Sequence, residues 1–298
     1  MTNFITRRTA VAMLAGSATL PTTAHSAVEP WTRGQSTPKI GMGTWITFDV
    51  PPTDEASRLA RVSVLRAFFE NGGRFIDSSP MYGMAEDTLG FCLDRLEDAP
   101  VIAATKVWIA DKALGMDQME ASRQLWRIPR FDIMQVHNLL QYEGHVETLR
   151  EMKDAEEVAA IGITTSHGRR HDAFARLMET DESLDTVQFT YNIEDREAEN
   201  RLLPLAAERG LKVIINRPFQ RGSLINRMKG REVPEFAKEI GITTWPQFLL
   251  KWVISHPAVT VAIPATSKLD HMNENMAVLN TPMPDAAMRA KMVEVFEG

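Results

Sequence analysis

The most constraining feature of this sequence is a regular alternation of short apolar runs with longer segments of helical periodicity. Helical segments such as those ending at Gly72 and at Gly210 separate the runs. Strands this apolar, separated by helices, predict a parallel sheet covered by helices on its outer face. Eight strand-like units after residue 27, over roughly 270 residues, fit a single closed (β/α)8 TIM barrel of α/β class, whose usual size is around 250 residues. The expected strands lie at residues 39–45, 74–79, 100–107, 131–138, 158–165, 185–192, 212–218 and 258–266.

A doubly wound sheet is the alternative architecture. The segment GMGTWI at residues 41–46 begins like a dinucleotide-binding fingerprint. That fingerprint needs a third glycine to open a helix, and Ile46 stands in its place. We therefore expect the barrel. No second domain is indicated, although residues 220–239 form a connection long enough to fold over a ligand.

The first 27 residues have the pattern of an export signal. Arg7 and Arg8 precede a weakly apolar run at residues 10–20, and small residues follow at 24–27. This pattern predicts a twin-arginine signal peptide over residues 1–27, recognised by the twin-arginine export machinery, and a barrel domain over residues 28–298. A membrane anchor is the alternative, but about a dozen apolar residues are too few to span a hydrocarbon core about 30 Å thick. We expect a periplasmic or otherwise exported mature chain without a stable membrane span.

Charge and cysteine content narrow the possible partners. The formal net charge is −6, and Lys and Arg form no cluster, so neither nucleic acid nor anionic membrane is expected as a partner. The single cysteine, Cys92, cannot form an intrachain disulfide, and its amphipathic surroundings predict a core thiol. His137, His167 and His171 lack the spacing of metal ligands, so no metal site is expected.

Three consecutive expected strands end in ionisable side chains. Asp77 follows the second strand, Lys106 ends the third and His137 ends the fourth, while Tyr82 lies in the loop after Asp77. The carboxyl ends of barrel strands meet at one rim, where such barrels place their active sites. Taken singly, these side chains could be a turn residue, a rim lysine and a core histidine. Three in succession are costly to bury unless their charges compensate one another, so we expect one shared site.

These side chains resemble the catalytic tetrad of the aldo-keto reductases. The segment GGRFIDSSPMYGMAEDTLG is similar to the first signature of that family, including Glu86 and Gly90. The lysine in ATK and the histidine in FDIMQVHN also stand where the family has them. The resemblance extends from Ile40 to about Leu279. It implies hydride transfer between a nicotinamide dinucleotide and an aldehyde or ketone, or from the alcohol in the reverse direction.

The resemblance also implies a role for each member of the tetrad. Tyr82 would be the general acid that protonates the carbonyl oxygen. A phenol with a pKa near 10 is a poor proton donor at neutral pH, but a neighbouring ammonium stabilises the phenolate and lowers that pKa. Lys106 would supply this charge, and Asp77 would keep Lys106 placed and protonated. His137 would orient the carbonyl oxygen.

The family pattern further implies contacts with the nicotinamide half of the cofactor. Ser166 matches a serine that contacts the carboxamide, and His167 replaces the asparagine that follows it. Gln188 matches a glutamine that contacts the same amide, although an inward-facing filler of the barrel is the alternative reading.

The end of the seventh strand departs from the family pattern. Asn216, two residues before Pro218, replaces the aromatic residue that usually stacks on the nicotinamide ring. Stacking is then weakened or provided by Phe219.

The adenosine end also departs from the family. Ala265 and His271 replace a lysine and an arginine, which lowers the positive charge available to a phosphate. NADP(H) remains the favoured cofactor, with NAD(H) as the rival. The contacts that remain are Thr266, Ser267 and Lys268 at a helix start, where backbone amides favour anions, and Glu274 and Asn275 for the adenine.

We expect the substrate pocket to be lined by the loops at residues 45–48 and 138–142 and by Met81 and Trp108, with Trp45 and Asn138 as members. Aromatic walls around a polar centre fit a small carbonyl compound. Two other functions stay open: a non-catalytic dinucleotide-binding redox sensor or partner subunit on the same barrel, and a barrel isomerase or lyase without cofactor.

Overall fold

The sheet of this protein closes into a barrel. The computed structural model describes residues 37–166 and 170–298, so the expected signal peptide and His167 lie outside the described residues. Each strand pairs in parallel with the next in chain order. Backbone bridges from Ile40 to Ala262 and from Gly43 to Ala265 place the last strand beside the first. The predicted (β/α)8 fold is confirmed. The strands are β1 (Met42–Gly43), β2 (Phe75–Asp77), β3 (Ile102–Val107), β4 (Phe131–His137), β5 (Val158–Thr164), β6 (Thr186–Thr190), β7 (Lys212–Asn216) and β8 (Val261–Ala262).

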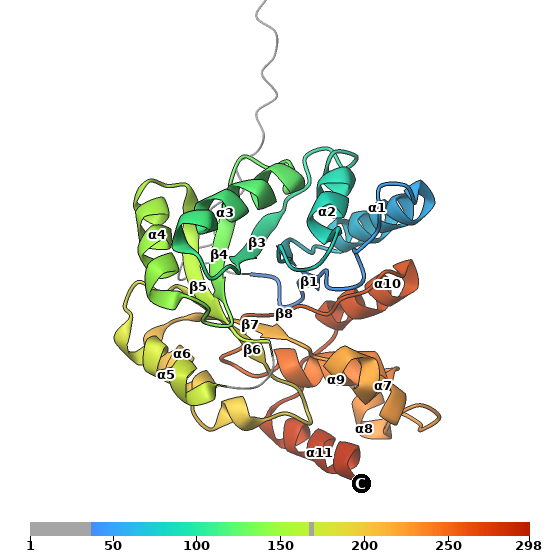
Figure 1. The fold of residues 1–298 in the computed structure, drawn as a ribbon. Helices are drawn as coiled ribbons and strands as arrows, with labels where there is room; N and C mark the ends of the chain where they lie inside the picture. Colours follow the sequence, from blue (N-terminus) through green and yellow to red (C-terminus); the bar gives the residue numbers. More distant parts are fainter. Residues whose placement is uncertain (1–36, 167–169) are drawn as a thin grey trace, which may run out of the picture.

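Helices surround the strands, and the C-terminal helix ends the chain on the outside of the molecule (Figure 1). None of the helices in the described part of the chain is long and apolar enough to cross a membrane. The helices are α1 (Glu55–Glu70), α2 (Ala85–Leu93), α3 (Lys112–Trp126), α4 (Tyr142–Asp154), α5 (His171–Thr180), α6 (Leu202–Arg209), α7 (Ser223–Arg227), α8 (Glu235–Lys238), α9 (Trp245–Ile254), α10 (Leu269–Ala277) and α11 (Ala286–Glu297), with short 3-10 turns η1 (Glu197–Glu199), η2 (Gln220–Gly222) and η3 (Val278–Asn280).

Helix ends follow local sequence signals. The Asp54 side chain accepts a hydrogen bond from the Ser57 amide at the start of α1. Gly210 ends α6 in the left-handed conformation with φ of 64°, as the sequence predicts. The segment before Gly210 is divided into η1 and α6 instead of forming one helix. Pro204 lies in the first turn of α6, where its missing N–H is tolerated but would interrupt a longer helix.

The barrel interior is filled by a small apolar cluster of alternate strand residues. Successive side chains of a strand point to opposite faces, so every second residue lines the interior. Counting on by two from this cluster leads from Phe75 to Asp77 and from Ala104 to Lys106. The apolar filling therefore ends where the ionisable residues begin. The cluster comprises Phe75, Ile102, Ala104, Ile133, Ala160, Ile214, Val261 and Ile263.

Outside the barrel, Glu86 joins α2 to the neighbouring elements. Its buried carboxylate accepts hydrogen bonds from Thr105 Oγ1 at 2.6 Å, Ser122 Oγ at 2.7 Å and Trp126 Nε1 at 3.1 Å. Burial raises the pKa of this carboxyl, and the three donors oppose the rise. The contacts connect α2, β3 and α3, and so hold the strand that carries Lys106.

Candidate active site

Tertiary structure brings the four expected catalytic side chains to one rim of the barrel. Asp77, Lys106 and His137 end β2, β3 and β4 and are almost fully buried, with exposed fractions of 2%, 0% and 1%. Tyr82 lies in the loop after β2 and is only partly buried. The three strands are neighbours in the sheet, so their carboxyl ends deliver these side chains to the same place.

A buried ion pair forms the base of the site. Lys106 Nζ donates to Asp77 Oδ2 at 2.6 Å and to the carbonyl oxygen of Ser78 at 2.6 Å. The same ammonium lies 5.3 Å from the centre of the Tyr82 ring. The carboxylate, the ammonium and the phenol ring therefore lie together at this rim.

Charge and burial act in opposite directions on these groups. Burial lowers the pKa of Lys106, but Asp77, Tyr82 and Glu86 outweigh burial, so the pKa lies above its ordinary value and the amine is an ammonium at neutral pH. Burial raises the pKa of Tyr82, and Lys106 opposes this rise. The predicted sign of the Lys106 effect is confirmed. The expectation of a net fall in the pKa of Tyr82 is wrong for this structure, because burial outweighs the ammonium.

Glutamine side chains hold the second oxygen of Asp77. Gln188 Nε2 donates to Asp77 Oδ1 at 2.9 Å, and Gln135 Nε2 lies 3.3 Å from the same atom. Gln188 Oε1 accepts from Thr164 Oγ1 at 2.9 Å. Gln188 thus orients the carboxylate while it faces the cavity. Sequence reasoning missed Gln135, although a polar residue two before His137 in an apolar strand points to the same interior face.

His137 is held from two sides. Its Nδ1 lies 3.3 Å from Ser79 Oγ, and its ring centre lies 6.4 Å from that of Trp108. Ser79 was not among the expected site residues. Trp108 is 40% exposed at the rim and borders His137 without lining the central cavity.

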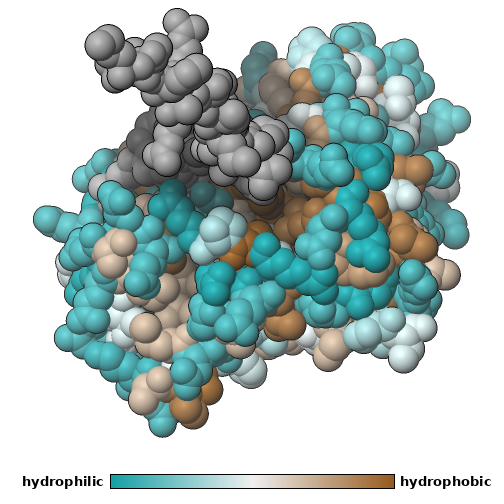
Figure 2. All heavy atoms as spheres, turned by 90° about the horizontal axis from the view of Figure 1, so that it is seen from above, coloured by the Kyte–Doolittle hydropathy of each residue, from teal (hydrophilic) through white to brown (hydrophobic). Residues whose placement is uncertain are grey.

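A cavity of about 520 Å³ opens over this site. It reaches from the end of β1 at Gly43 to the start of α10, past the catalytic side chains. Seen from above, hydrophilic side chains cover most of the visible surface and apolar ones gather in part of it (Figure 2). The expected residues that line the cavity are Trp45, Asp77, Met81, Tyr82, His137, Ser166, Gln188, Asn216, Pro218, Thr266, Glu274 and Asn275.

Some expected residues lie beside the cavity or away from it. Asn138 Oδ1 accepts from the Ser166 amide at 3.1 Å and from Ser166 Oγ at 3.2 Å, so Asn138 positions a lining residue. Ser267 and Lys268 precede α10 without lining the cavity. In the two loops expected to form the substrate pocket, Phe48 and Tyr142 are core residues instead, because apolar packing takes up both rings.

Asn216 faces the cavity with its amide fixed by the sheet edge. Asn216 Oδ1 accepts from Thr190 Oγ1 at 2.8 Å, and Asn216 Nδ2 donates to the Thr165 carbonyl oxygen at 2.9 Å. The residue therefore ties together the ends of β5, β6 and β7. Phe219 also lines the cavity and is the nearby aromatic side chain.

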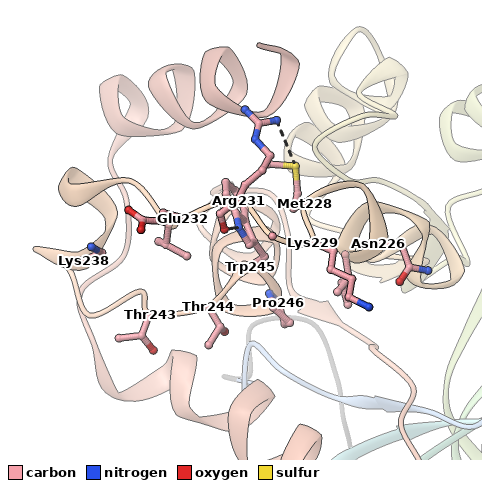
Figure 3. Close-up of a pocket in the computed structure, with 13 residues that line it drawn as sticks. Asn226, Met228, Lys229, Arg231, Glu232, Lys238, Thr243, Thr244, Trp245 and Pro246 are labelled. Carbon is pink, nitrogen blue, oxygen red and sulfur yellow. Dashed lines mark hydrogen bonds between the residues drawn. The ribbon is translucent and has the colours of Figure 1, made fainter.

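A second hollow of about 670 Å³ lies outside the barrel, beside the start of α9 (Figure 3). Its lining includes Lys229, Arg231 and Trp245, and it shares Ile225, Asn226 and Pro246 with the central cavity. It contains none of the four expected catalytic side chains. Within residues 37–166 and 170–298, no group of three or more His, Cys, Asp or Glu side chains could hold a metal ion.

Known proteins are similar to this chain in sequence and in fold. The aldo-keto reductase YhdN of Bacillus subtilis is 27% identical over 208 residues, which cover 64% of this chain and 61% of that protein. The NADH-specific methylglyoxal reductase of Escherichia coli is 23% identical over an alignment of 318 residues, covering 87% of this chain and 95% of that protein. The crystal structure of an aldo/keto reductase from Klebsiella pneumoniae in complex with NADP and acetate superposes with a TM-score of 0.73 at 25% identity, covering 87% of this chain and 92% of the other. The model of the Aldo/keto reductase family matches residues 39–292, so the chain belongs to that family.

Proposed function

We propose that this protein transfers hydride between a nicotinamide dinucleotide and a small aldehyde or ketone, with Tyr82 as the general acid or base. The observation that carries the proposal is the buried pair of Lys106 and Asp77, joined at 2.6 Å beside the Tyr82 ring. Membership in the aldo/keto reductase family supports the same reaction.

The cavity fits a dinucleotide. Ser166 and Gln188 place hydroxyl and amide groups near the catalytic end, and Thr266, Glu274 and Asn275 line the end beside α10. When bound, the cofactor supplies or accepts the hydride. One similar solved structure contains NADP, and one similar enzyme is named NADH-specific. NADP(H) is the favoured cofactor of this protein, and NAD(H) is the rival.

The side chains of the protein move and stabilise the proton. At neutral pH Tyr82 is protonated, because burial raises its pKa, so it can donate to the carbonyl oxygen. As the phenolate develops, the Lys106 ammonium stabilises it at short range in a site of low dielectric. Asp77 keeps Lys106 charged and placed, and His137 orients the carbonyl oxygen. In the alcohol direction the same phenolate accepts the proton.

A titration and a turnover assay test the proposal together. The mature protein is titrated with NADPH and NADH and assayed with a panel of aldehydes by nicotinamide absorbance. Tyr82→Phe should keep dinucleotide affinity and lose at least 100-fold in kcat, because one general acid typically contributes about 10²- to 10⁴-fold. Tyr191→Phe, which alters a buried phenol bonded to Glu199 outside the cavity, is the matched control.

Each alternative function gives a different result in these assays. Dinucleotide binding without turnover by the wild type would indicate the non-catalytic binding protein. No dinucleotide affinity would indicate an isomerase or lyase. Full activity in Tyr82→Phe would remove Tyr82 from the mechanism.

We also propose export by the twin-arginine route, on the strength of Arg7, Arg8 and the apolar run that follows them. That route carries folded proteins, so the enzyme would leave with its dinucleotide bound and regenerate it with a second substrate. The test is a reporter fused to residues 1–35 in cells with and without the twin-arginine translocase, followed by mass spectrometry of the exported protein for bound nucleotide. A reporter that stays in the cytoplasm of both strains refutes export.

A further inference from the structure

A buried serine lies against the histidine of the proposed active site. Ser79 Oγ is 3.3 Å from His137 Nδ1, and the two residues are 0% and 1% exposed. Ser79 lies two residues after the end of β2, and His137 ends β4, so the contact joins two strands that β3 separates in the sheet. The ring of His137 is therefore connected to the loop that carries Tyr82.

The burial of Ser79 decides the direction of this hydrogen bond. A neutral imidazole has one N–H and one acceptor nitrogen, and a hydroxyl can donate or accept. Within residues 37–166 and 170–298, the only hydrogen-bond partner of the Ser79 hydroxyl is His137 Nδ1, and Ser79 does not line the central cavity. If Nδ1 carried the proton, the buried O–H of Ser79 would have no acceptor, which costs the desolvation of that group. We therefore assign Ser79 as the donor and Nδ1 as the acceptor.

A donor at Nδ1 also determines the state of the other ring nitrogen. When Nδ1 accepts, the single proton of the neutral ring is on Nε2. His137 lines the central cavity together with Tyr82, whereas Ser79 lies outside its lining. Because the Nδ1 side of the ring is turned to Ser79, a substrate in the cavity meets the Nε2 side.

Two donors then act on one carbonyl oxygen of the substrate. That oxygen has two lone pairs, so it can take the proton of the Tyr82 hydroxyl and accept from His137 Nε2–H at the same time. As negative charge develops on the oxygen, a donor that is already oriented stabilises it without reorganisation. The opposite tautomer would present the lone pair of Nε2, which repels the carbonyl oxygen. The tautomer of His137 therefore affects the rate of carbonyl reduction.

From these contacts, and resting on the proposed carbonyl reduction, we propose that Ser79 is a positioning residue that holds His137 with the proton on Nε2. Ser79 acts through the imidazole ring and touches neither the substrate nor the cofactor. Its carbonyl oxygen also accepts from the Tyr82 amide at 3.0 Å, so one buried residue helps to place both donors.

The position of the proton is measured by long-range proton–nitrogen NMR. In such spectra the protonated nitrogen of a neutral imidazole resonates well upfield of the other one. The spectra are recorded at about pH 8, where an unperturbed histidine is neutral, and the signals that are missing in His137→Gln identify the ring. We expect the proton on Nε2 in wild type. In Ser79→Ala the Nδ1 signal should move downfield, because that nitrogen loses its hydrogen-bond donor.

The same variants are assayed for turnover with the panel of aldehydes. Ser79→Ala should lower kcat about 2- to 10-fold, as for the loss of one neutral hydrogen bond, and leave KM and dinucleotide affinity within about twofold. Ser79→Thr keeps the hydroxyl and should keep both the wild-type spectrum and most of the turnover. Thr88→Val is the matched control, because it removes a hydroxyl that is also 0% exposed and that donates to the Val50 carbonyl oxygen at 3.1 Å, outside the cavity.

Two results overturn the proposal while carbonyl reduction stands. In the first, wild type carries the proton on Nδ1, and this spectrum decides the matter even if Ser79→Ala does not fold. In the second, Ser79→Ala lowers kcat no more than Thr88→Val does, or lowers it with the Nδ1 signal unchanged, which gives Ser79 a structural role only. Absence of turnover by wild type with every aldehyde refutes carbonyl reduction itself, together with the role of Ser79 in it.

Discussion

Removing the carboxylate from the buried ion pair tests the electrostatic design of the site. In Asp77→Asn, Lys106 would remain with an exposed fraction of 0% and without its 2.6 Å carboxylate partner. Breaking a buried pair by removing one partner typically lowers the free energy of unfolding by about 3–5 kcal/mol. The Ser78 carbonyl oxygen still accepts from Lys106, so we expect a value near 3 kcal/mol.

The assay is urea unfolding of the protein, followed by the fluorescence of buried Trp126 and Trp252. The double variant Asp77→Leu with Lys106→Met is the control, because it removes both charges and should regain most of the lost stability. A loss below about 1 kcal/mol in Asp77→Asn would refute the reasoning, since it would mean that water reaches the ammonium.

The same variant should change catalysis in a defined direction. Without Asp77, burial of Lys106 is less strongly opposed, so the pKa of the amine falls from its raised position. The ammonium that stabilises the Tyr82 phenolate is then lost at lower pH. We expect a lower kcat throughout and a high-pH limb of the rate profile that moves to lower pH. An unchanged limb would show that Asp77 does not control the charge of Lys106.

Three further predictions concern groups outside the catalytic contacts. Burial raises the pKa of Asp132 to about 6, so the folded state binds this proton more tightly than the unfolded state, and the free energy of unfolding falls as pH rises from about 4 to about 6. In urea unfolding, Asp132→Asn should abolish this fall and be more stable than wild type by up to about 3 kcal/mol at pH 8. A variant with the wild-type pH dependence would contradict the assignment. A Cβ on Gly90 would lie 2.0 Å from the Leu125 carbonyl oxygen, so Gly90→Ala should lower the free energy of unfolding by about 1–3 kcal/mol in thermal unfolding. A variant that melts at the wild-type temperature would exclude this close packing of α2 on α3. Burial raises the pKa of Cys92 to about 12, so the thiol should react with iodoacetamide only after urea unfolds the protein. Rapid labelling of the folded protein, measured by mass spectrometry, would contradict the place of Cys92 in the core.

The sequence by itself determined the barrel and the identity of its catalytic end. Eight apolar runs alternating with helical segments admit few packings, because each helix must cover the outer face of a parallel sheet. Because alternate side chains of a strand point to the same face, Asp77 and Lys106 both point into the barrel at the same rim. These signals are local, so they are legible in residues that lie next to one another in the chain.

Only the tertiary structure decided which groups meet across the barrel. Gln188 reaches Asp77 from a strand 111 positions away in the chain, and no local pattern encodes that contact. The net pKa of Tyr82 depends on burial by several elements, so sequence reasoning assigned the Lys106 effect correctly and the balance wrongly. The structure also decided the placement of Arg217 and Arg221 at the central cavity, because the left-handed turn that holds them is a property of the folded chain.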